Sequence, residues 1–196
     1  TSGITFTGTG GELQYSSVNT TDYSSKFANS SAAISIDTNG QNVNFASAIA
    51  ATNSGGFNKL GAGTLTFTQN NAYTGTTTIS GGTLQLGNNT TTGSVAGNIV
   101  DNANLVFDYA AQYHGVAYTG NISGTGNVTV TGPNQTNFSG TNTYTGSTTI
   151  TGGGLLYLGF NNAGGNFSGM GNVINVQNGA LAIWSNIAMP TTGVVT

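Results

Sequence analysis

The chain has 196 residues, and only 4% of them are charged: two lysines and five acidic residues give a net charge of −3. So few cations exclude a nucleic-acid binder, which needs a patch of Lys and Arg to neutralise phosphates. The lack of cysteine excludes disulfides and thiol chemistry, and no apolar stretch approaches the ~18 residues of a membrane-spanning helix. We therefore expect no nucleic-acid partner and no membrane insertion by this segment.

Strand-forming segments recur along the whole chain, whereas helix-forming segments are rare. Nearly half of the residues are Gly, Thr or Asn, which a helix tolerates poorly. Short runs instead alternate an apolar residue with a residue of any kind, as a strand does when it buries one face. In chain order these runs are 4–6, 34–36, 43–45, 65–67, 84–86, 105–107, 128–130, 156–158, 174–176 and 181–183.

The segment 12–26 lies between the first two runs and holds three of the seven charged residues. Asp22 and Lys26 are four positions apart, a spacing at which one helical turn brings opposite charges together. A solvated loop between strands is an equally good interpretation of this segment.

The spacing of the strands indicates a solenoid. Equivalent apolar residues recur after 22, 19, 21 and 23 residues, from Val43 through Leu65, Leu84 and Leu105 to Val128. Antiparallel hairpins would place neighbouring strands only ~8–12 residues apart. A coil of ~20 residues, meaning one complete circuit of a solenoid, explains the longer spacing. We therefore predict an all-β fold, a right-handed parallel β-helix of roughly nine coils in which residues 1–196 form one unit.

A longer repeat is superimposed on the coils. Residues 73–82 (YTGTTTISGG) match residues 144–153 (YTGSTTITGG) at eight of ten positions, an offset of 71, which Phe67 and Phe138 share. Residues 61–65 resemble residues 124–128 at an offset of 63. The difference indicates an eight-residue insertion around 132–135, which we expect in a turn between coils. The two copies extend over about 57–89 and 121–161.

These residues resemble the passenger-associated transport repeat of bacterial autotransporters. Residues 59–67 read K-x-G-x-G-T-L-x-F, residues 71–79 read N-x-Y-x-G-x-T-x-I, and residues 81–87 read G-G-T-L-x-L-G. The second copy is looser and lacks the lysine. The resemblance implies a β-helical passenger segment that is exported to the cell surface, or secreted, by a bacterium of the Gram-negative type.

The motif also implies positions in the core and at the corners. We expect inward-pointing side chains that stack on their equivalents one coil away at Leu65, Phe67, Ile79, Leu84 and Leu86, with Tyr144 and Ile150 as counterparts in the second copy. Tyr73 is expected near a corner with its hydroxyl at the edge. Positive φ angles are expected at Gly75, Gly81 and Gly82, and left-handed backbone or stacked amides at Asn70 and Asn71.

Residues 108–118 are the first place to look for a ligand site. They contain Tyr109, Tyr113, His114 and Tyr118. In an exposed loop these rings would bind a surface glycan or protein. The alternative is that they pack locally over the end of a coil.

No group of residues indicates catalysis. His114 is the sole histidine, without a second ligand at metal-binding spacing. The acidic residues are scattered rather than paired as glycoside hydrolysis requires: Glu12, Asp22, Asp37, Asp101 and Asp108. We therefore predict no enzyme, no catalytic residues, no metal and no cofactor.

The functional prediction is a non-enzymatic structural or adhesive segment of a bacterial surface or secreted protein. Strand-like sequence at both ends suggests a longer solenoid or a filament, and we expect self-association, end to end or side by side. Two alternatives stay open. One is an adhesin that binds glycan or protein through the aromatic loop, and the other is an ice-binding array of outward-facing threonines on strands such as 64–68 and 76–78.

Overall fold

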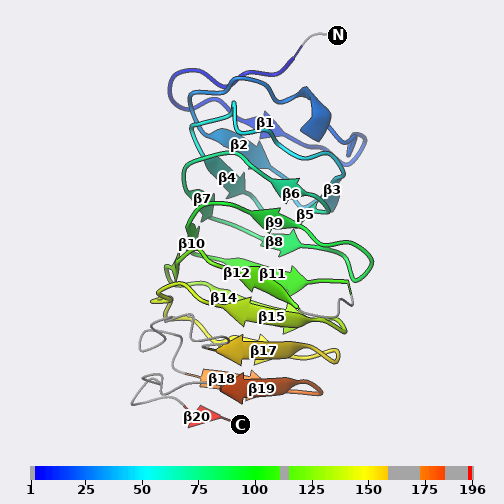
Figure 1. Ribbon diagram of the computed structural model, residues 1–196. Helices are drawn as coiled ribbons and strands as arrows, with labels where there is room; N and C mark the ends of the chain where they lie inside the picture. The colour runs from blue at the N-terminus through cyan, green and yellow to red at the C-terminus, as the bar shows by residue number, and fades with distance from the viewer. Residues whose placement is uncertain (1–2, 111–114, 159–172, 184–193, 196) are drawn as a thin grey trace.

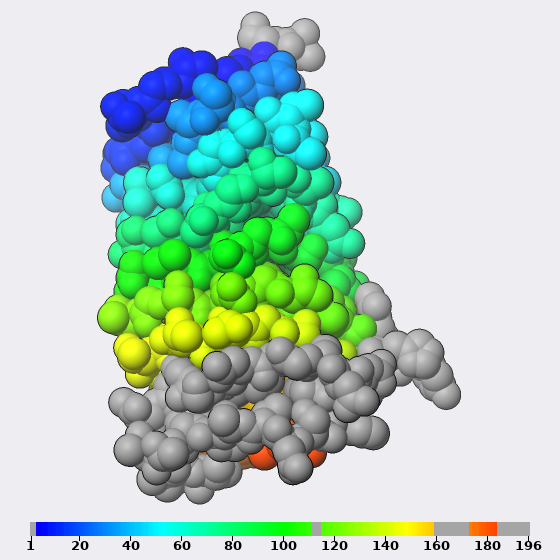
Figure 2. Space-filling view, turned by 60° about the vertical axis from the view of Figure 1, so that its left-hand side comes forward, coloured from blue at the N-terminus to red at the C-terminus, as the bar shows by residue number. Residues whose placement is uncertain are grey.

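Parallel strands stacked along one axis build the fold, a β-solenoid of about seven coils (Figure 1). The computed structural model describes residues 3–110, 115–158, 173–183 and 194–195. Successive parts of the chain follow one another in order along the long axis, as the colour bands in Figure 2 show. The all-β parallel solenoid is therefore confirmed, whereas the right-handed sense and the count of nine coils stay predictions.

An eight-stranded parallel sheet extends along the axis in the order β20-β18-β16-β14-β11-β8-β5-β3. Its strands are separated by one coil each. In chain order they are β3 (Val43–Phe45), β5 (Thr64–Phe67), β8 (Thr83–Leu86), β11 (Asn104–Asp108), β14 (Asn127–Thr131), β16 (Thr148–Ile150), β18 (Val173–Val176) and β20 (Val194–Val195).

A second, six-stranded sheet has the order β1-β2-β4-β7-β10-β13 and covers the N-terminal part. Its strands are β1 (Leu13–Gln14), β2 (Ile34–Asp37), β4 (Phe57–Leu60), β7 (Thr77–Ile79), β10 (Ile99–Asp101) and β13 (Ile122–Ser123). Within the described residues the helical content is one 3-10 turn, Ser24–Lys26, in the charged segment 12–26.

Two smaller sheets form further faces. A four-stranded sheet in the C-terminal part contains β12 (Val116–Tyr118), β15 (Gln135–Phe138), β17 (Leu155–Leu158) and β19 (Ala180–Ile183). The last sheet pairs β6 (Asn70–Asn71) with β9 (Ser94–Val95).

The register reproduces the spacing read from the sequence. Val43 lies opposite Leu65, Leu65 opposite Leu84, Leu84 opposite Leu105 and Leu105 opposite Val128. Because parallel in-register strands keep the same residues facing inward, each apolar side chain rests on an apolar side chain of the next coil. The buried residues form one continuous hydrophobic cluster along the axis.

Aromatic rings reinforce this cluster. Phe6, Phe27, Phe45 and Phe67 form a ladder with centroid separations of 6.0, 5.6 and 5.8 Å. A second group surrounds Phe107, whose ring lies 5.1 to 5.9 Å from those of Tyr109, Tyr118 and Phe138. Such separations allow favourable ring contacts in addition to the burial of apolar area.

The two sequence repeats do not occupy equivalent places in the solenoid. The matching segments Thr77–Ile79 and Thr148–Ile150 belong to different sheets, because β7 pairs with β4 and β10 whereas β16 pairs with β14 and β18. The inserted residues begin an extra strand, β15, so they form more than a turn. An offset of 71 residues therefore corresponds to three complete coils plus the step to the next sheet around the axis. Phe67 and Phe138 consequently lie in different sheets, so our alignment of these two residues is wrong for the structure.

Candidate functional site

The repeated motif places its tyrosine in the core, where we expected the hydroxyl at an edge. Tyr73 and Tyr144 are both fully buried. The Tyr73 hydroxyl is 2.6 Å from Oγ1 of Thr77, and the Tyr144 hydroxyl is 2.5 Å from Oγ1 of Thr148. Burial raises the pKa of each tyrosine, and the threonine hydrogen bond acts in the opposite direction. The spacing Y-x-x-x-T thus supplies a partner for a phenol that water does not reach.

The apolar motif residues line the interior. Six of them are fully buried in the strands and stack across coils: Leu65, Phe67, Ile79, Leu84, Leu86 and Ile150. Their side chains serve packing, as the resemblance implied.

The motif lysine, whose role the sequence did not reveal, is buried at a corner. Lys59 Nζ donates to the carbonyl oxygens of Leu60 and Gly61, both at 2.8 Å, and of Gly81 at 3.0 Å. Burial lowers the pKa of Lys59 to about 8, and the carboxylate of Asp37 acts in the opposite direction. Because Gly81 lies one coil after the other two carbonyls, the ammonium group links neighbouring coils.

The glycines of this corner have two different functions. Gly82 has a φ of +63°, and a Cβ there would lie 2.3 Å from the Gly63 carbonyl oxygen of the preceding coil. Gly81 has no positive φ, contrary to our prediction. A Cβ on Gly81 would instead be 3.1 Å from the Gly61 carbonyl oxygen, so close approach of two coils explains this glycine.

Asparagines join coils by a different contact from the stacked amides that we considered. Asn71 Oδ1 accepts from the backbone N–H of Ile49 at 2.9 Å, and its Nδ2 donates to the Ser94 carbonyl at 3.1 Å, so this side chain connects three coils. Asn53 and Asn142 make the same kind of acceptor contact to the preceding coil, at 3.0 Å each. Neither Asn70 nor Asn71 has a positive φ; Asn29, Asn39, Asn89 and Asn178 do.

The predicted aromatic loop is only partly described. Tyr113 and His114 lie outside the described residues. Tyr109 and Tyr118 are buried, and the Tyr118 hydroxyl donates to the Gly97 carbonyl at 2.7 Å. These two rings are therefore not exposed for a ligand, which agrees with the alternative that they pack against the core.

The outward row of the largest sheet does not form a continuous threonine array. The register aligns Asn44, Thr66, Gln85, Val106, Thr129, Thr149 and Asn175. An amide and a valine interrupt the hydroxyl row, which argues against the ice-binding alternative.

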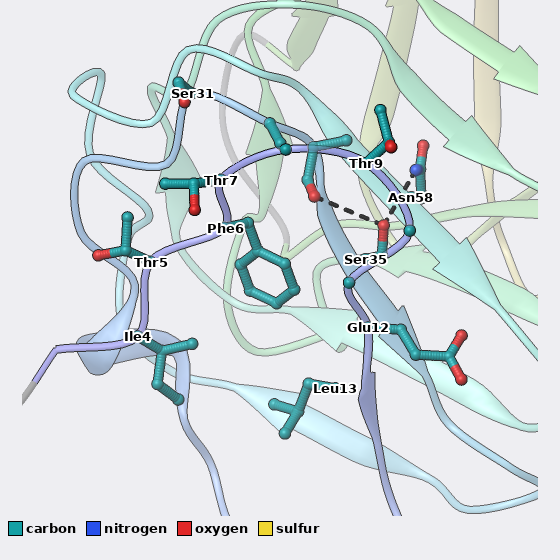
Figure 3. A pocket seen from close by; sticks show the side chains of 15 residues that line it. Ile4, Thr5, Phe6, Thr7, Thr9, Glu12, Leu13, Ser31, Ser35 and Asn58 are labelled. Carbon is teal, nitrogen blue, oxygen red and sulfur yellow. Dashed lines mark hydrogen bonds between the residues drawn. The ribbon is translucent and has the colours of Figure 1, made fainter.

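An open pocket lies at the N-terminal end of the described solenoid (Figure 3). It has a volume of about 770 Å³ and is lined by the segment 4–13, by residues 31–33 and by Ser35 and Asn58. The close view shows the Phe6 ring in the middle, while Asn58 Nδ2 donates to Ser35 Oγ at 3.1 Å. Glu12 is the single ionisable residue in this lining, so the pocket does not bring together two carboxylates.

Within the described ranges, no three His, Cys, Asp or Glu side chains are grouped so that they could hold a metal ion. The same part of the chain contains no helix that is long and apolar enough to cross a membrane.

Comparison with known proteins gives two matches. The family model for the passenger-associated-transport-repeat matches residues 57–86 and 123–156. The "Adhesin BmaC autotransporter" of Brucella suis biovar 1 (strain 1330) is 60% identical over 52 residues, which are 26% of this chain and 1% of that protein. No solved structure matches the chain.

This chain carries two passenger-associated transport repeats and is similar to a segment of an autotransporter adhesin. Its matched repeats lie within the two copies found in the sequence, and their motif residues form the core and the corners of the solenoid. A passenger segment of this kind is located outside the cell, at the surface of a Gram-negative bacterium. The matched part of the chain covers only about 1% of the length of that adhesin.

Proposed function

We propose that this passenger segment is a non-enzymatic scaffold that presents an adhesive bacterial surface. One observation carries the proposal: the motif residues of both repeats are used in packing or in contacts between coils. Those side chains are buried and contact the core or a neighbouring coil. The similarity to an adhesin autotransporter supports the adhesive part of the proposal.

The surface chemistry supports self-association as the means of adhesion. Seven ionisable side chains from Asp, Glu and Lys are spread over 196 residues, so little charge repulsion opposes contact between copies. Outward strand positions carry amide and hydroxyl groups, such as those of Asn44, Thr66 and Thr129. We infer that copies associate end to end or side by side, and that a fibre is the extended form of this contact.

Sedimentation velocity over a wide range of concentration tests the self-association. We expect the weight-average sedimentation coefficient to rise with concentration and to depend little on salt, because few charges take part. A single monomeric species at all concentrations would contradict the proposal.

Adhesion needs a separate measurement. Beads coated with residues 1–196 should be retained in a flow cell on a surface coated with the same segment. The matched control is Leu84→Asp, which places a charge in the fully buried core and should unfold the solenoid. Equal retention of both kinds of bead would show that the folded surface is not the adhesive element.

A further inference from the structure

Asp101 is the buried carboxyl group of this solenoid. It ends β10, has no exposed surface, and faces inward on the row that also contains Ile79 of the preceding coil. Its Oδ1 accepts from the backbone N–H of Ala103 at 3.0 Å, whereas its Oδ2 is buried without a hydrogen-bond partner. A buried carboxylate oxygen without a partner is costly, so its protonation state needs a physical explanation.

The next coil closes tightly over this carboxyl group. A Cβ on Gly126 would lie 2.4 Å from Asp101 Cγ and 2.6 Å from Oδ2, so only glycine fits there. The Gly126 N–H in turn donates to the Asp101 carbonyl at 2.7 Å. Water is therefore excluded from the side of the carboxyl group that faces the 124–126 corner.

The coil that precedes the first repeat shows which group can occupy the position equivalent to Asp101. The offset of 63 that aligns residues 61–65 with 124–128 also aligns Thr38 with Asp101, and the registers agree, with Asp37 opposite Leu60 and Val100 opposite Ser123. Thr38 is likewise fully buried, and its hydroxyl donates to the Ala62 carbonyl of the next coil at 2.5 Å. The coil before the first copy thus places an O–H donor under the 61–65 corner, whereas the coil before the second copy places a carboxyl group under the 124–126 corner.

We propose that Asp101 is a proton-binding site of the folded solenoid. In mildly acidic surroundings its carboxyl group takes up a proton from solvent and, like Thr38, donates a hydrogen bond to a backbone carbonyl of the 124–126 corner. Only the protonated acid has an O–H to donate, so loss of the proton leaves a buried carboxylate whose Oδ2 has no hydrogen-bond partner. The contact between these coils is therefore weakened as the pH rises.

Two other ionisable groups face Asp101 from neighbouring elements. Tyr144, two coils further along the chain, has its pKa raised by burial and also by the charge of Asp101, so it stays protonated in the neutral range. Lys59 lies on the same inward row, separated from Asp101 by Ile79, and is held by its three carbonyl contacts. Neither group supplies a direct ion pair to the unpaired Oδ2.

The raised pKa of Asp101 sets the sign of the change in stability with pH and the pH range over which this change occurs. Burial raises the pKa to about 6 from the ordinary 3.8, against the opposing effect of the Ala103 hydrogen bond. The folded chain binds the proton more tightly than the unfolded chain, so the stabilisation is complete below about pH 4 and is lost as the pH rises through about 6. A separation of about two units corresponds to roughly a hundredfold change in the folding equilibrium constant.

Urea unfolding at about pH 4 and about pH 8 tests the proposal, with Asp101→Asn and Asp101→Thr as variants. Relative to either variant, the wild-type folding constant should be up to roughly a hundredfold higher at the acidic pH than at the alkaline pH. Asp101→Thr introduces the residue type found at the equivalent position, Thr38, so it should fold even if the amide does not. The same ratio of wild type to variant at both pH values would overturn the proposal.

A matched control and a direct titration complete the test. Asp108 is an acid on the outward side of β11 whose pKa burial also raises; Asp108→Asn should keep the pH dependence that belongs to Asp101. The carboxyl carbon of Asp101 in the folded wild-type segment, followed by 13C NMR, should titrate near pH 6. A titration midpoint at or below the ordinary value of 3.8 would contradict the proposal whether or not any variant folds.

Discussion

Single buried polar side chains define the repeat at the residue scale. In each copy a tyrosine hydroxyl lies in the core and has one threonine hydroxyl as its partner. Lys59 satisfies three carbonyls, and Asn71 connects three coils. Because a buried polar group that loses its partner costs more than a hydrogen bond contributes, such pairs favour one arrangement of the coils.

Tyr73→Phe should lower the free energy of unfolding by about 1 to 3 kcal/mol, because the buried Thr77 hydroxyl loses its partner. The double variant Tyr73→Phe with Thr77→Val removes both polar groups and should recover most of this loss. Urea unfolding followed by circular dichroism measures both values. A double variant less stable than the single one would show that the hydroxyl pair is not the cause.

At the scale of elements, the corners between strands determine how closely neighbouring coils approach each other. The Gly-Gly pair of the motif occurs in both copies, as residues 81–82 and 152–153. Gly82 faces the Gly63 carbonyl of the preceding coil, whereas a Cβ on Gly153 would meet nothing within 4 Å. The difference arises because the second copy is displaced by one sheet around the axis, so identical sequences contact different neighbours.

Gly82→Ala should therefore destabilise the segment more than Gly153→Ala. Both substitutions introduce a side chain at positive φ, +63° and +83°, which costs about 1 to 2 kcal/mol. Gly82→Ala adds a clash between β4–β5 and β7–β8, so those coils must separate. Equal losses of unfolding free energy in the two variants would contradict the role of this close approach.

At the scale of the whole molecule, the repetition of similar coils determines the contacts and the stability. Each coil contacts mainly the coils before and after it, and one apolar cluster extends through them. Stability in such an array is approximately the sum of the coil and interface contributions. Removal of one complete coil should therefore shorten the solenoid without changing its register.

Deletion of residues 77–98 tests this expectation, because it joins Thr76 to Ile99, which already lies opposite Thr77. Leu65 would then face Leu105 directly, and Lys59 would face Asp101. We expect native β-sheet circular dichroism, cooperative unfolding, and a urea slope lower by roughly one seventh. Deletion of residues 77–87 removes about half a coil and should abolish folding; an equally stable product would contradict the coil register.

The amino-acid sequence by itself determined the strands, their spacing and the interior. Alternation in runs such as 65–67 and 84–86 sets which side chains face inward, and steps of 19 to 23 residues set the coil, because a stacked parallel strand must repeat its inward residues. The passenger repeat was also visible in the sequence, since its glycines and apolar residues occur at fixed local spacing.

Only the tertiary structure decided which groups meet across coils. The partners of Lys59 and of Asp101 include residues about one coil away, so no local pattern could reveal them. The burial of Tyr118 depends on the pairing of β12 with β15, and the second repeat is shifted by one sheet because additional residues precede β16. Local sequence therefore determines each strand, whereas the order of faces around the axis determines what every side chain contacts.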